Sequence, residues 1–218
     1  MYKVIEVKQS IFEDNNKDAD LLRQECKEKG VFLLNIMSSP GSGKTTTLSR
    51  TIETIKDEVN IGVMEADIDS DVDAHTISQY GVRTIQLHTG GMCHLDADMT
   101  RQGLHELGME NLDLAVLENV GNLVCPASYD LGQHLNVVLL SVTEGSDKPQ
   151  KYPVMFKKAD LVIISKADLA HHFDFDVEEA SRECKKLNPK VDILILDSKT
   201  GKNLELWYQY LRLKKELF

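Results

Sequence analysis

A run of glycine, lysine and hydroxyl residues between Ser38 and Thr45 has the composition of a loop that binds phosphate groups. It follows the apolar segment 31–37 and precedes a helical pattern, which is the strand–loop–helix context that a P-loop requires. Backbone N–H groups of Gly41 and Gly43 can converge on phosphate oxygens there. The strict P-loop pattern has glycine at the position of Ser38. The predicted nucleotide-binding residues of this loop are Pro40, Gly41, Ser42, Gly43, Lys44, Thr45 and Thr46.

Carboxylates at two other predicted strand ends complete a magnesium site with this loop. Asp67 ends one apolar segment and Glu118 ends another, and ligands of open α/β sheets bind beyond the carboxyl ends of the strands. Both side chains are therefore placed to hold Mg²⁺ with the Thr45 hydroxyl, while Lys44 reaches the β- and γ-phosphates. The predicted catalytic residues are Lys44, Asp67, Asp73 and Glu118.

The acidic segment 67–73 has the alternating aspartates of a calcium loop. A calcium loop needs glycine at its sixth position and glutamate at its twelfth, where this chain has Val72 and Ser78. The sequence therefore favours a nucleotide-sensing switch segment over a calcium site.

A lysine and an aspartate after a later apolar segment, 161–165, indicate which base is bound. The sequence S-K-A-D, from Ser165 to Asp168, resembles the N-K-x-D guanine motif of GTPases. The Asp168 carboxylate can accept hydrogen bonds from the ring N–H and the exocyclic amine of guanine, and adenine offers neither donor in that geometry. We therefore expect GTP and GDP to bind. The predicted base-binding residues are Lys166 and Asp168, with Ser198 and Lys199 on a loop that closes from the other side.

Two cysteines and a histidine form a candidate site for a soft metal ion. Cys93 and His94 lie in the loop after the third predicted strand, and Cys125 lies in the loop after the fourth. We expect those strands to be neighbours, which would bring the loops together. Two thiolates and an imidazole suit Ni²⁺ or Zn²⁺ but are one ligand short of tetrahedral coordination. Water, His88, a partner protein or a second copy could complete the set, and buried thiols beside an incidental histidine are the structural alternative.

The segments that must position these residues alternate between short apolar runs and helical patterns. The predicted strands are 31–37, 59–65, 83–87, 112–118, 136–142, 161–165 and 191–196, with helical spacing in 95–107 and 177–187. Most of the runs are continuously apolar, as expected of strands that are covered on both faces. The pattern predicts the α/β class: a P-loop NTPase with a mainly parallel, doubly wound sheet and helices on both faces.

The chain reads as a single domain. Residues 1–30 form the predicted N-terminal helical extension, with a charged amphipathic helix over 11–29, and residues 31–218 form the P-loop GTPase domain, which ends in a helix over 204–218. The length of 218 residues suits one sizeable domain.

Composition limits the partners and the compartment. The net charge of −10 argues against broad electrostatic binding to nucleic acid or to an anionic membrane. No apolar run approaches the roughly 20 residues that span a bilayer, and the N-terminal residues have no apolar signal-peptide core. We therefore expect a cytoplasmic protein whose four cysteines are thiols or metal ligands.

Taken together, these motifs resemble the HypB family, the nickel-incorporation GTPases of hydrogenase maturation. The resemblance covers roughly residues 31–218. It rests on S-S-P-G-S-G-K-T, the E-A-D strand end, T-G-G-M-C-H-L-D-A, E-N-V-G-N-L-V-C-P, S-V-T-E-G-x-D-K-x-x-K-Y-P and S-K-A-D. The pair of cysteine-containing motifs is specific among P-loop proteins.

The resemblance implies a homodimer that forms on GTP binding, with a metal site of Cys93, His94 and Cys125 at its interface. It also implies delivery of nickel to the hydrogenase large subunit, with help from a small nickel- and zinc-binding partner of the HypA type. A family lysine in the loop after the fifth predicted strand reaches the neighbouring subunit's guanine, and Lys148 is the matching candidate.

Two family features are missing from the sequence: an N-terminal cysteine-rich nickel motif, since the first cysteine is Cys26, and a histidine-rich storage stretch. Storage of many nickel ions is therefore not expected. The nearest alternative is the urease-type nickel-maturation GTPase, whose C-P-H motif would require histidine at Ala127. Partitioning-type ATPases would need a lysine at Ser39, and a small-molecule kinase would need a base for the acceptor hydroxyl.

Overall fold

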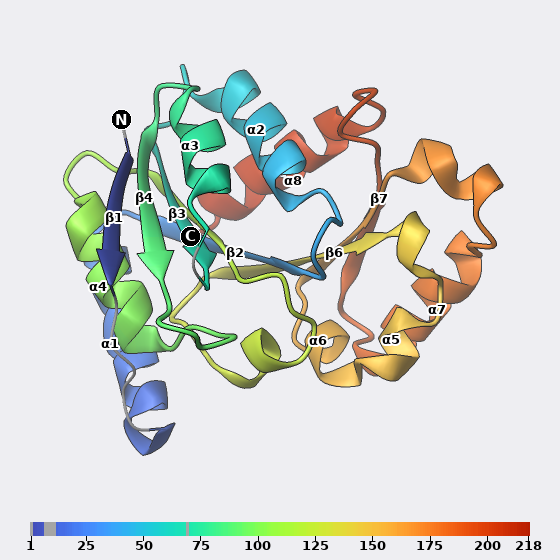
Figure 1. Ribbon diagram of the computed structural model, residues 1–218, viewed down its shortest axis with the longest axis horizontal. Helices are drawn as coiled ribbons and strands as arrows, with labels where there is room; N and C mark the ends of the chain where they lie inside the picture. The colour runs from blue at the N-terminus through green and yellow to red at the C-terminus, as the bar shows by residue number, and fades with distance from the viewer. Residues whose placement is uncertain (1, 7–11, 69) are drawn as a thin grey trace.

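The protein is built around one parallel β-sheet (Figure 1). The computed structural model describes residues 2–6, 12–68 and 70–218. Within these residues the strands run in the order β1-β4-β3-β5-β2-β6-β7-β8, and every pair of neighbours is parallel. The strands are β1 (Tyr2–Glu6), β2 (Phe32–Ser38), β3 (Ile61–Asp67), β4 (Arg83–His88), β5 (Leu114–Glu118), β6 (Leu135–Ser141), β7 (Leu161–Ser165) and β8 (Asp192–Ile195).

Helices cover both faces of this sheet, as Figure 1 shows. One face carries α2 (Lys44–Ile55), α3 (Val72–Ser78) and α8 (Leu204–Glu216), whose apolar side chains share a core with the sheet. The other face carries α1 (Phe12–Lys29), α4 (Ala97–Leu107), α5 (Lys148–Lys151), α6 (Pro153–Lys157) and α7 (Val177–Leu187). Short 3₁₀ turns are η1 (Cys125–Ser128), η2 (Val142–Glu144) and η3 (Ala167–His172). The α/β class and the doubly wound architecture are confirmed.

The central strand β2 shows why the apolar runs are continuous. Phe32, Leu34 and Ile36 enter the core beneath α2 and α8, whereas Leu33 and Met37 enter the cores on the opposite face. Because successive side chains point to opposite faces, a strand covered on both sides is apolar at most positions. A buried exception within β2, Asn35, is hydrogen-bonded to Asn136 and Asn119. Each predicted strand corresponds to an observed one, with ends that differ by a few residues at most.

The N-terminal strand β1 was missed by the sequence reading. Residues 1–30 were predicted to be helical, but Tyr2–Glu6 pairs with Thr84–His88 of β4 at the sheet edge. This strand is five residues long and includes Lys3 and Glu6, so it lacks the continuous apolar run that marks the central strands. The predicted helix is present as α1, while residues 1 and 7–11 lie outside the described residues. The division into an extension and a GTPase domain stays a prediction.

The strand order fixes where ligands can bind. β2 lies between β5 and β6: the chain leaves β2 for β3 on one side of it and later crosses from β5 to β6 on the other side, so the carboxyl end of β2 lies at a topological switch point. The loops after β2, β3, β5, β7 and β8 all open at that edge. Among the described residues, no helix combines the length and the apolar character needed to cross a bilayer.

Candidate functional site

The loop after β2 has the backbone shape of a phosphate cradle. Gly41 and Gly43 have φ of 72° and 100°, a left-handed conformation that side chains disfavour, and Gly43 caps the N-terminus of α2. Lys44 Nζ donates a hydrogen bond to Ser38 Oγ at 3.2 Å, so the ammonium group lies over the loop. Ser38 thus contacts the predicted phosphate lysine from the position where the strict pattern has glycine.

A cavity of about 670 Å³ opens beside this loop. Its volume lies in the range of about 300–1,000 Å³ that is usual for small-molecule sites. Most of the predicted phosphate and magnesium residues line it, namely Pro40, Gly41, Gly43, Lys44, Thr45, Thr46, Asp67 and Asp73. The structure therefore brings residues from the ends of β2 and β3 and from α3 into one hollow. Asp69, inside the predicted switch segment, lies outside the described residues.

Two buried glutamates and an exposed aspartate form a cluster of carboxylates beside this hollow. Thr45 Oγ1 donates to Glu118 Oε1 at 2.7 Å, which joins the first turn of α2 to the end of β5. Glu65 pairs in register with Glu118 on the neighbouring strand. One possible ligand oxygen from each of Glu65, Asp73 and Glu118 lies within 4.8 Å of the others. Asp67 lines the adjoining cavity, and its Oδ1 accepts from Ser70 N at 3.0 Å.

Glu65 is the member of this cluster that the sequence reading missed. Burial, and then the nearby Glu118, raise the pKa of its carboxyl group well above the usual range. Burial also raises the pKa of Glu118, while Lys44 opposes that shift. Glu65 Oε1 and Glu118 Oε2 are buried without a hydrogen-bond partner. Orphaned oxygens of this kind are costly unless something satisfies them, and a hard divalent cation fits the donor set.

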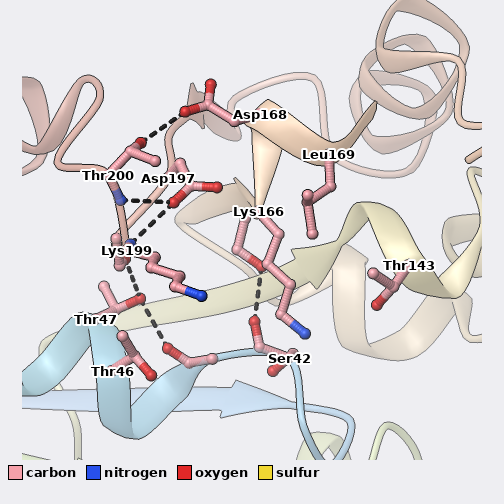
Figure 2. Close-up of a pocket in the computed structure, with 13 residues that line it drawn as sticks. Ser42, Thr46, Thr47, Thr143, Lys166, Asp168, Leu169, Asp197, Lys199 and Thr200 are labelled. Carbon is pink, nitrogen blue, oxygen red and sulfur yellow. Dashed lines mark hydrogen bonds between the residues drawn. The ribbon is translucent and has the colours of Figure 1, made fainter. Parts of the chain in front are cut away.

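A second cavity, of about 560 Å³, adjoins the P-loop on the side of β7 and β8 (Figure 2). Lys166 has a left-handed backbone, with φ of 57°, and its Nζ donates to Gly41 O at 2.7 Å. Ser165 Oγ donates to Ser42 O at 2.8 Å, so the residue that replaces asparagine in the base motif ties β7 to the P-loop. Lys166 and Asp168 line the cavity together with Ser42, Gly43 and Thr46.

Asp168 is held by the loop that follows β8. Its carboxylate accepts from Thr200 Oγ1 at 2.6 Å and from Lys202 Nζ at 2.7 Å. These two hydrogen bonds lower the pKa of Asp168, that from Lys202 most, so the group is a ready acceptor. The same loop is closed by Asp197, whose Oδ1 accepts from the backbone of Lys199 and Thr200. Figure 2 shows this loop facing Lys166 and Leu169 across the cavity.

The three remaining predicted nucleotide residues are Ser198, Lys199 and Lys148, and they differ in position. Ser198 lines the cavity, and its hydroxyl is 2.7 Å from Thr47 Oγ1 on α2, while Lys199 lines the same wall. Lys148 starts α5, lies 5.7 Å above the Tyr152 ring and is outside the lining of both cavities.

The predicted metal ligands Cys93, His94 and Cys125 lie close together, in the loops that follow β4 and β5. The sulfur atoms of Cys93 and Cys125 are 2.7 Å apart, and both residues are thiols. His94 Nδ1 lies 4.0 Å from Cys93 Sγ. The His94 ring stacks on Tyr129 at 4.1 Å between centroids, and His94 Nε2 is buried without a hydrogen-bond partner. An orphaned ring nitrogen beside two thiols fits a metal-binding role.

The protonation and the spacing of Cys93, His94 and Cys125 leave the candidate metal site incomplete. The hydrogen bond with Cys125 raises the pKa of the Cys93 thiol, and burial lowers the pKa of His94, which keeps the imidazole neutral as a metal ligand must be. In the described part of the chain, the carboxylate trio is the group in which one ligand atom of each residue lies within 4.8 Å of the others, and Cys93, His94 and Cys125 do not meet that distance as a set.

The strands that precede these two loops are arranged differently from the expectation. β4 and β5, which precede them, were expected to be neighbours, but β3 lies between the two strands. Motif spacing along the chain does not report this order, because tertiary packing decides which strands become neighbours.

The fold and the two sites define a P-loop nucleotide-binding protein. Residues 32–195 match the family described as CobW/HypB/UreG, nucleotide-binding domain. The hydrogenase maturation factor HypB of Rhizobium leguminosarum bv. viciae is 45% identical over 96% of this chain and 70% of its own. The hydrogenase/urease maturation factor HypB of Helicobacter pylori is 42% identical over 98% of this chain and 89% of its own.

Solved structures agree with this relationship. The crystal structure of HypB from Helicobacter pylori in complex with nickel has a TM-score of 0.88 and 42% identity, and the match covers 93% of this chain and 95% of that one. The chain belongs to the HypB family of hydrogenase maturation factors.

Proposed function

We propose that this chain is a GTP-binding and GTP-hydrolysing metallochaperone that delivers nickel during maturation of [NiFe]-hydrogenase. GTP-dependent dimerisation would gate a nickel or zinc site of Cys93, His94 and Cys125. The observation that carries the proposal is the short connection between the sites: Glu118 accepts from Thr45 of the P-loop, and Cys125, seven residues later, contacts Cys93.

The nucleotide would bind across both cavities. Its base would lie over the Lys166 stem, with Asp168 as the guanine acceptor and Ser198 and Lys199 on the opposite wall. Its phosphates would meet the backbone N–H groups of Gly41–Thr46 and the Lys44 ammonium group. The two cavities share Gly43, Thr46 and Lys166, which supports one continuous ligand across them.

Magnesium fits the carboxylate end of this site. Thr45 and Glu118 would hold the ion, with Asp67 and Asp73 beside it and Glu65 as a further oxygen donor. When bound, Mg²⁺ neutralises charge on the β- and γ-phosphate oxygens. Lys44 would steady the same phosphates, so the protein's own part in hydrolysis is to position the γ-phosphate and stabilise its charge.

We expect intrinsic hydrolysis to be slow. Residues 118–128 contain no glutamine that could orient the attacking water, and segments 67–73 and 118–121 contain no arginine that could act as a finger. Single-turnover GTP hydrolysis by the isolated protein measures this rate. Turnover as fast as that of a GTPase with its activating partner would contradict the expectation.

The metal ion would bind at the end of the segment that runs from Glu118 to Cys125. The two thiols and His94 supply three ligands, and a second copy or water would supply the rest. An incomplete set suits an ion that must be released, because closed four-thiolate sites hold zinc as part of the fold. By resemblance, a HypA-type nickel and zinc protein and the hydrogenase large subunit are the proposed partners, and Lys148 would reach the guanine of the other subunit.

Urease maturation is a second candidate role. The Helicobacter pylori relative is named a hydrogenase/urease maturation factor, which makes a shared nickel supply reasonable for this chain too. The hydrogenase role takes precedence, because Cys125-Pro126 is followed by Ala127 rather than by the histidine of the urease-type motif.

The test is a Ni²⁺ and Zn²⁺ titration of the wild type, Cys93→Ala and Cys125→Ala, with sedimentation measured alongside. With a non-hydrolysable GTP analogue and Mg²⁺ we expect a dimer that binds metal through these cysteines, and with GDP a monomer. Cys184→Ala, which removes a buried thiol of α7, is the matched control. Metal stoichiometry that is unchanged in both site variants would remove these cysteines from the function.

A further inference from the structure

One buried side chain of α1 joins the two loops that carry the proposed metal ligands. Asn15 is 3% exposed. Its Oδ1 accepts from Ala97 N at 2.8 Å, and its Nδ2 donates to Asp130 O at 2.9 Å. Ala97 lies three residues after His94, and Asp130 lies five residues after Cys125. A single amide group therefore bridges the backbones of both loops close to their ligands.

The sheet does not set the spacing of these loops by itself. They follow β4 and β5, and β3 separates those strands, so no ladder of hydrogen bonds joins the two loop origins directly. Something outside the sheet must hold Cys93 beside Cys125. The amide of Asn15 and the stacking of His94 on Tyr129 are contacts that span both loops.

Both anchor points are themselves rigid. Ala97 begins α4, and the preceding residue Asp96 caps that helix by accepting from Met99 N at 2.8 Å. On the other loop, Asp130 forms an ion pair with Arg23 of α1. A Cβ atom at Gly132 would lie 2.9 Å from Ala19 O, so this loop runs against the helix too closely for a side chain. Movement of α1 would therefore move both loops.

We propose that Asn15 is a positioning residue for metal binding: it fixes the separation of Cys93 and Cys125 and thereby sets the affinity of the site. The inference rests on the proposed metal site. An amide is suited to the task because it presents one acceptor and one donor at the end of a short side chain. Loss of outer contacts of this kind typically lowers metal affinity about 10- to 100-fold.

Two substitutions separate the contributions of the two loops. Asn15→Ala removes both hydrogen bonds and leaves Ala97 N and Asp130 O without this partner. Asn15→Asp keeps an acceptor for Ala97 N but places a second acceptor against Asp130 O, so it disrupts only the loop of Cys125. Cys26→Ala is the control, because Cys26 is a fully buried residue of α1 that forms neither bridge.

The experiment measures two properties of the full-length protein. The first is the rate at which diamide oxidises Cys93 and Cys125 to a disulfide, followed in metal-free protein by the loss of two hydrogens in the mass of the linking peptides. The second is Ni²⁺ affinity by competition with a chelator. We expect both Asn15 variants to be oxidised about 10-fold more slowly and to bind Ni²⁺ about 10-fold more weakly than the wild type. The Cys26→Ala control should match the wild type.

GDP affinity, measured in EDTA, should be unchanged in the Asn15 variants, because α1 does not line either nucleotide cavity. Oxidation and Ni²⁺ binding at wild-type values in Asn15→Asp would overturn the positioning role, and this milder variant gives the answer even if Asn15→Ala does not fold. Failure of Cys93→Ala to alter Ni²⁺ binding would instead overturn the metal site itself. Slow oxidation in the Asn15 variants would then still show that the amide sets the loop spacing.

Discussion

At the scale of single residues, the proposed base selectivity rests on how Asp168 is held. Thr200 and Lys202 each donate to one of its carboxylate oxygens, so the group is oriented before any nucleotide arrives. An ionised carboxylate in the lining of the cavity favours a base with two N–H donors. Because Thr200 and Lys202 donate to a charged carboxylate, a neutral side chain in place of Asp168 would also weaken these two contacts.

Asp168→Asn should therefore reverse the base preference. An amide presents one donor and one acceptor, which suits the carbonyl of xanthine better than the amine of guanine. We expect GTP affinity to fall about 10- to 100-fold, the range that one charge-assisted hydrogen bond provides, while XTP gains over GTP. Competition between fluorescent nucleotides measures this. Asp174→Asn, an exposed aspartate after the same strand, is the control, and equal wild-type affinity for ATP and GTP would refute the assignment.

Glu65 offers a second prediction at this scale. Glu65→Gln keeps the shape of the side chain but removes one carboxylate from the trio with Asp73 and Glu118. Mg²⁺ would lose a charged oxygen ligand or an outer contact, so the concentration needed to support GTP binding should rise about 10-fold. Thermal stability without Mg²⁺ should stay the same or increase, because a buried acidic group is removed.

The measurement is a Mg²⁺ titration of GTP-analogue binding. Glu53→Gln, a change at an exposed glutamate of α2, serves as the control. If Glu65→Gln and the wild type required the same Mg²⁺ concentration, Glu65 would have no part in the cation site.

The residues that the sequence did and did not predict differ in one physical respect. Lys44, Thr45, Asp168 and Cys93 could be proposed from the sequence because each stands in a motif formed by neighbours a few positions away in the chain. Glu65 depends on Glu118 across a strand pairing, and Asn15 depends on partners 82 and 115 positions away. Such contacts exist only once the strand order is set, and spacing along one chain does not report it.

At the scale of elements, the same limit applies to one edge of the sheet, since β8 at the other edge was predicted. The strands covered by helices on both faces could be read from their continuous apolar runs, but the edge strand β1 could not. The order β4-β3-β5 was also beyond the sequence, although a parallel sheet was not. A strand that helices cover on both faces can be recognised from its apolar composition, whereas tertiary packing decides which strand lies beside it.

The amino ends of β2 and β6 carry a titratable contact. Leu33 N donates to His134 Nδ1 at 2.9 Å, and the His134 ring stacks on Phe32 and packs at a tilt against Phe218. Burial, and then the positive charge of Arg23, lower the pKa of His134 to about 4. The unfolded histidine titrates near 6.5. Between these values the unfolded chain binds more protons, so stability must fall as the pH is lowered from about 6.5 toward 4.

His134→Asn should remove this acid sensitivity, because the Asn Oδ1 atom can take the hydrogen bond from Leu33 N without binding a proton. At pH 5 we expect the wild type to have lost about 1 kcal/mol relative to this variant, a value discounted for the solvent exposure of the ring. Urea midpoints at pH 7 and pH 5 supply the comparison. The control is His172→Asn, at an exposed histidine. Parallel loss of stability in wild type and His134→Asn would show that the ring does not titrate in this window.

At the scale of the whole molecule, the nucleotide and metal sites share one segment. Glu118 ends β5 at the P-loop, Gly121 lies so close to Pro40 that an added Cβ would be 3.2 Å away, and Cys125 opens η1. Buried Asn119 holds this segment to the centre of the sheet through Asn35. A rearrangement of this segment around the γ-phosphate would therefore reach the Cys125 thiol, one of the proposed metal ligands, within a few residues.

This arrangement predicts reciprocal coupling. If a GTP analogue with Mg²⁺ tightens Ni²⁺ binding, saturating Ni²⁺ must tighten the GTP analogue by the same factor, because both paths connect the same states. Couplings of this type are typically about 1–3 kcal/mol, or roughly 5- to 150-fold. The measurement is calorimetric titration of the analogue and of GDP, each with and without Ni²⁺. Cys125→Ala should abolish the nickel effect while keeping nucleotide affinity, since its thiol contacts Cys93 and lines neither nucleotide cavity. Identical analogue affinity with and without bound Ni²⁺ would mean that the sites are close together but independent, and that nucleotide does not gate the metal.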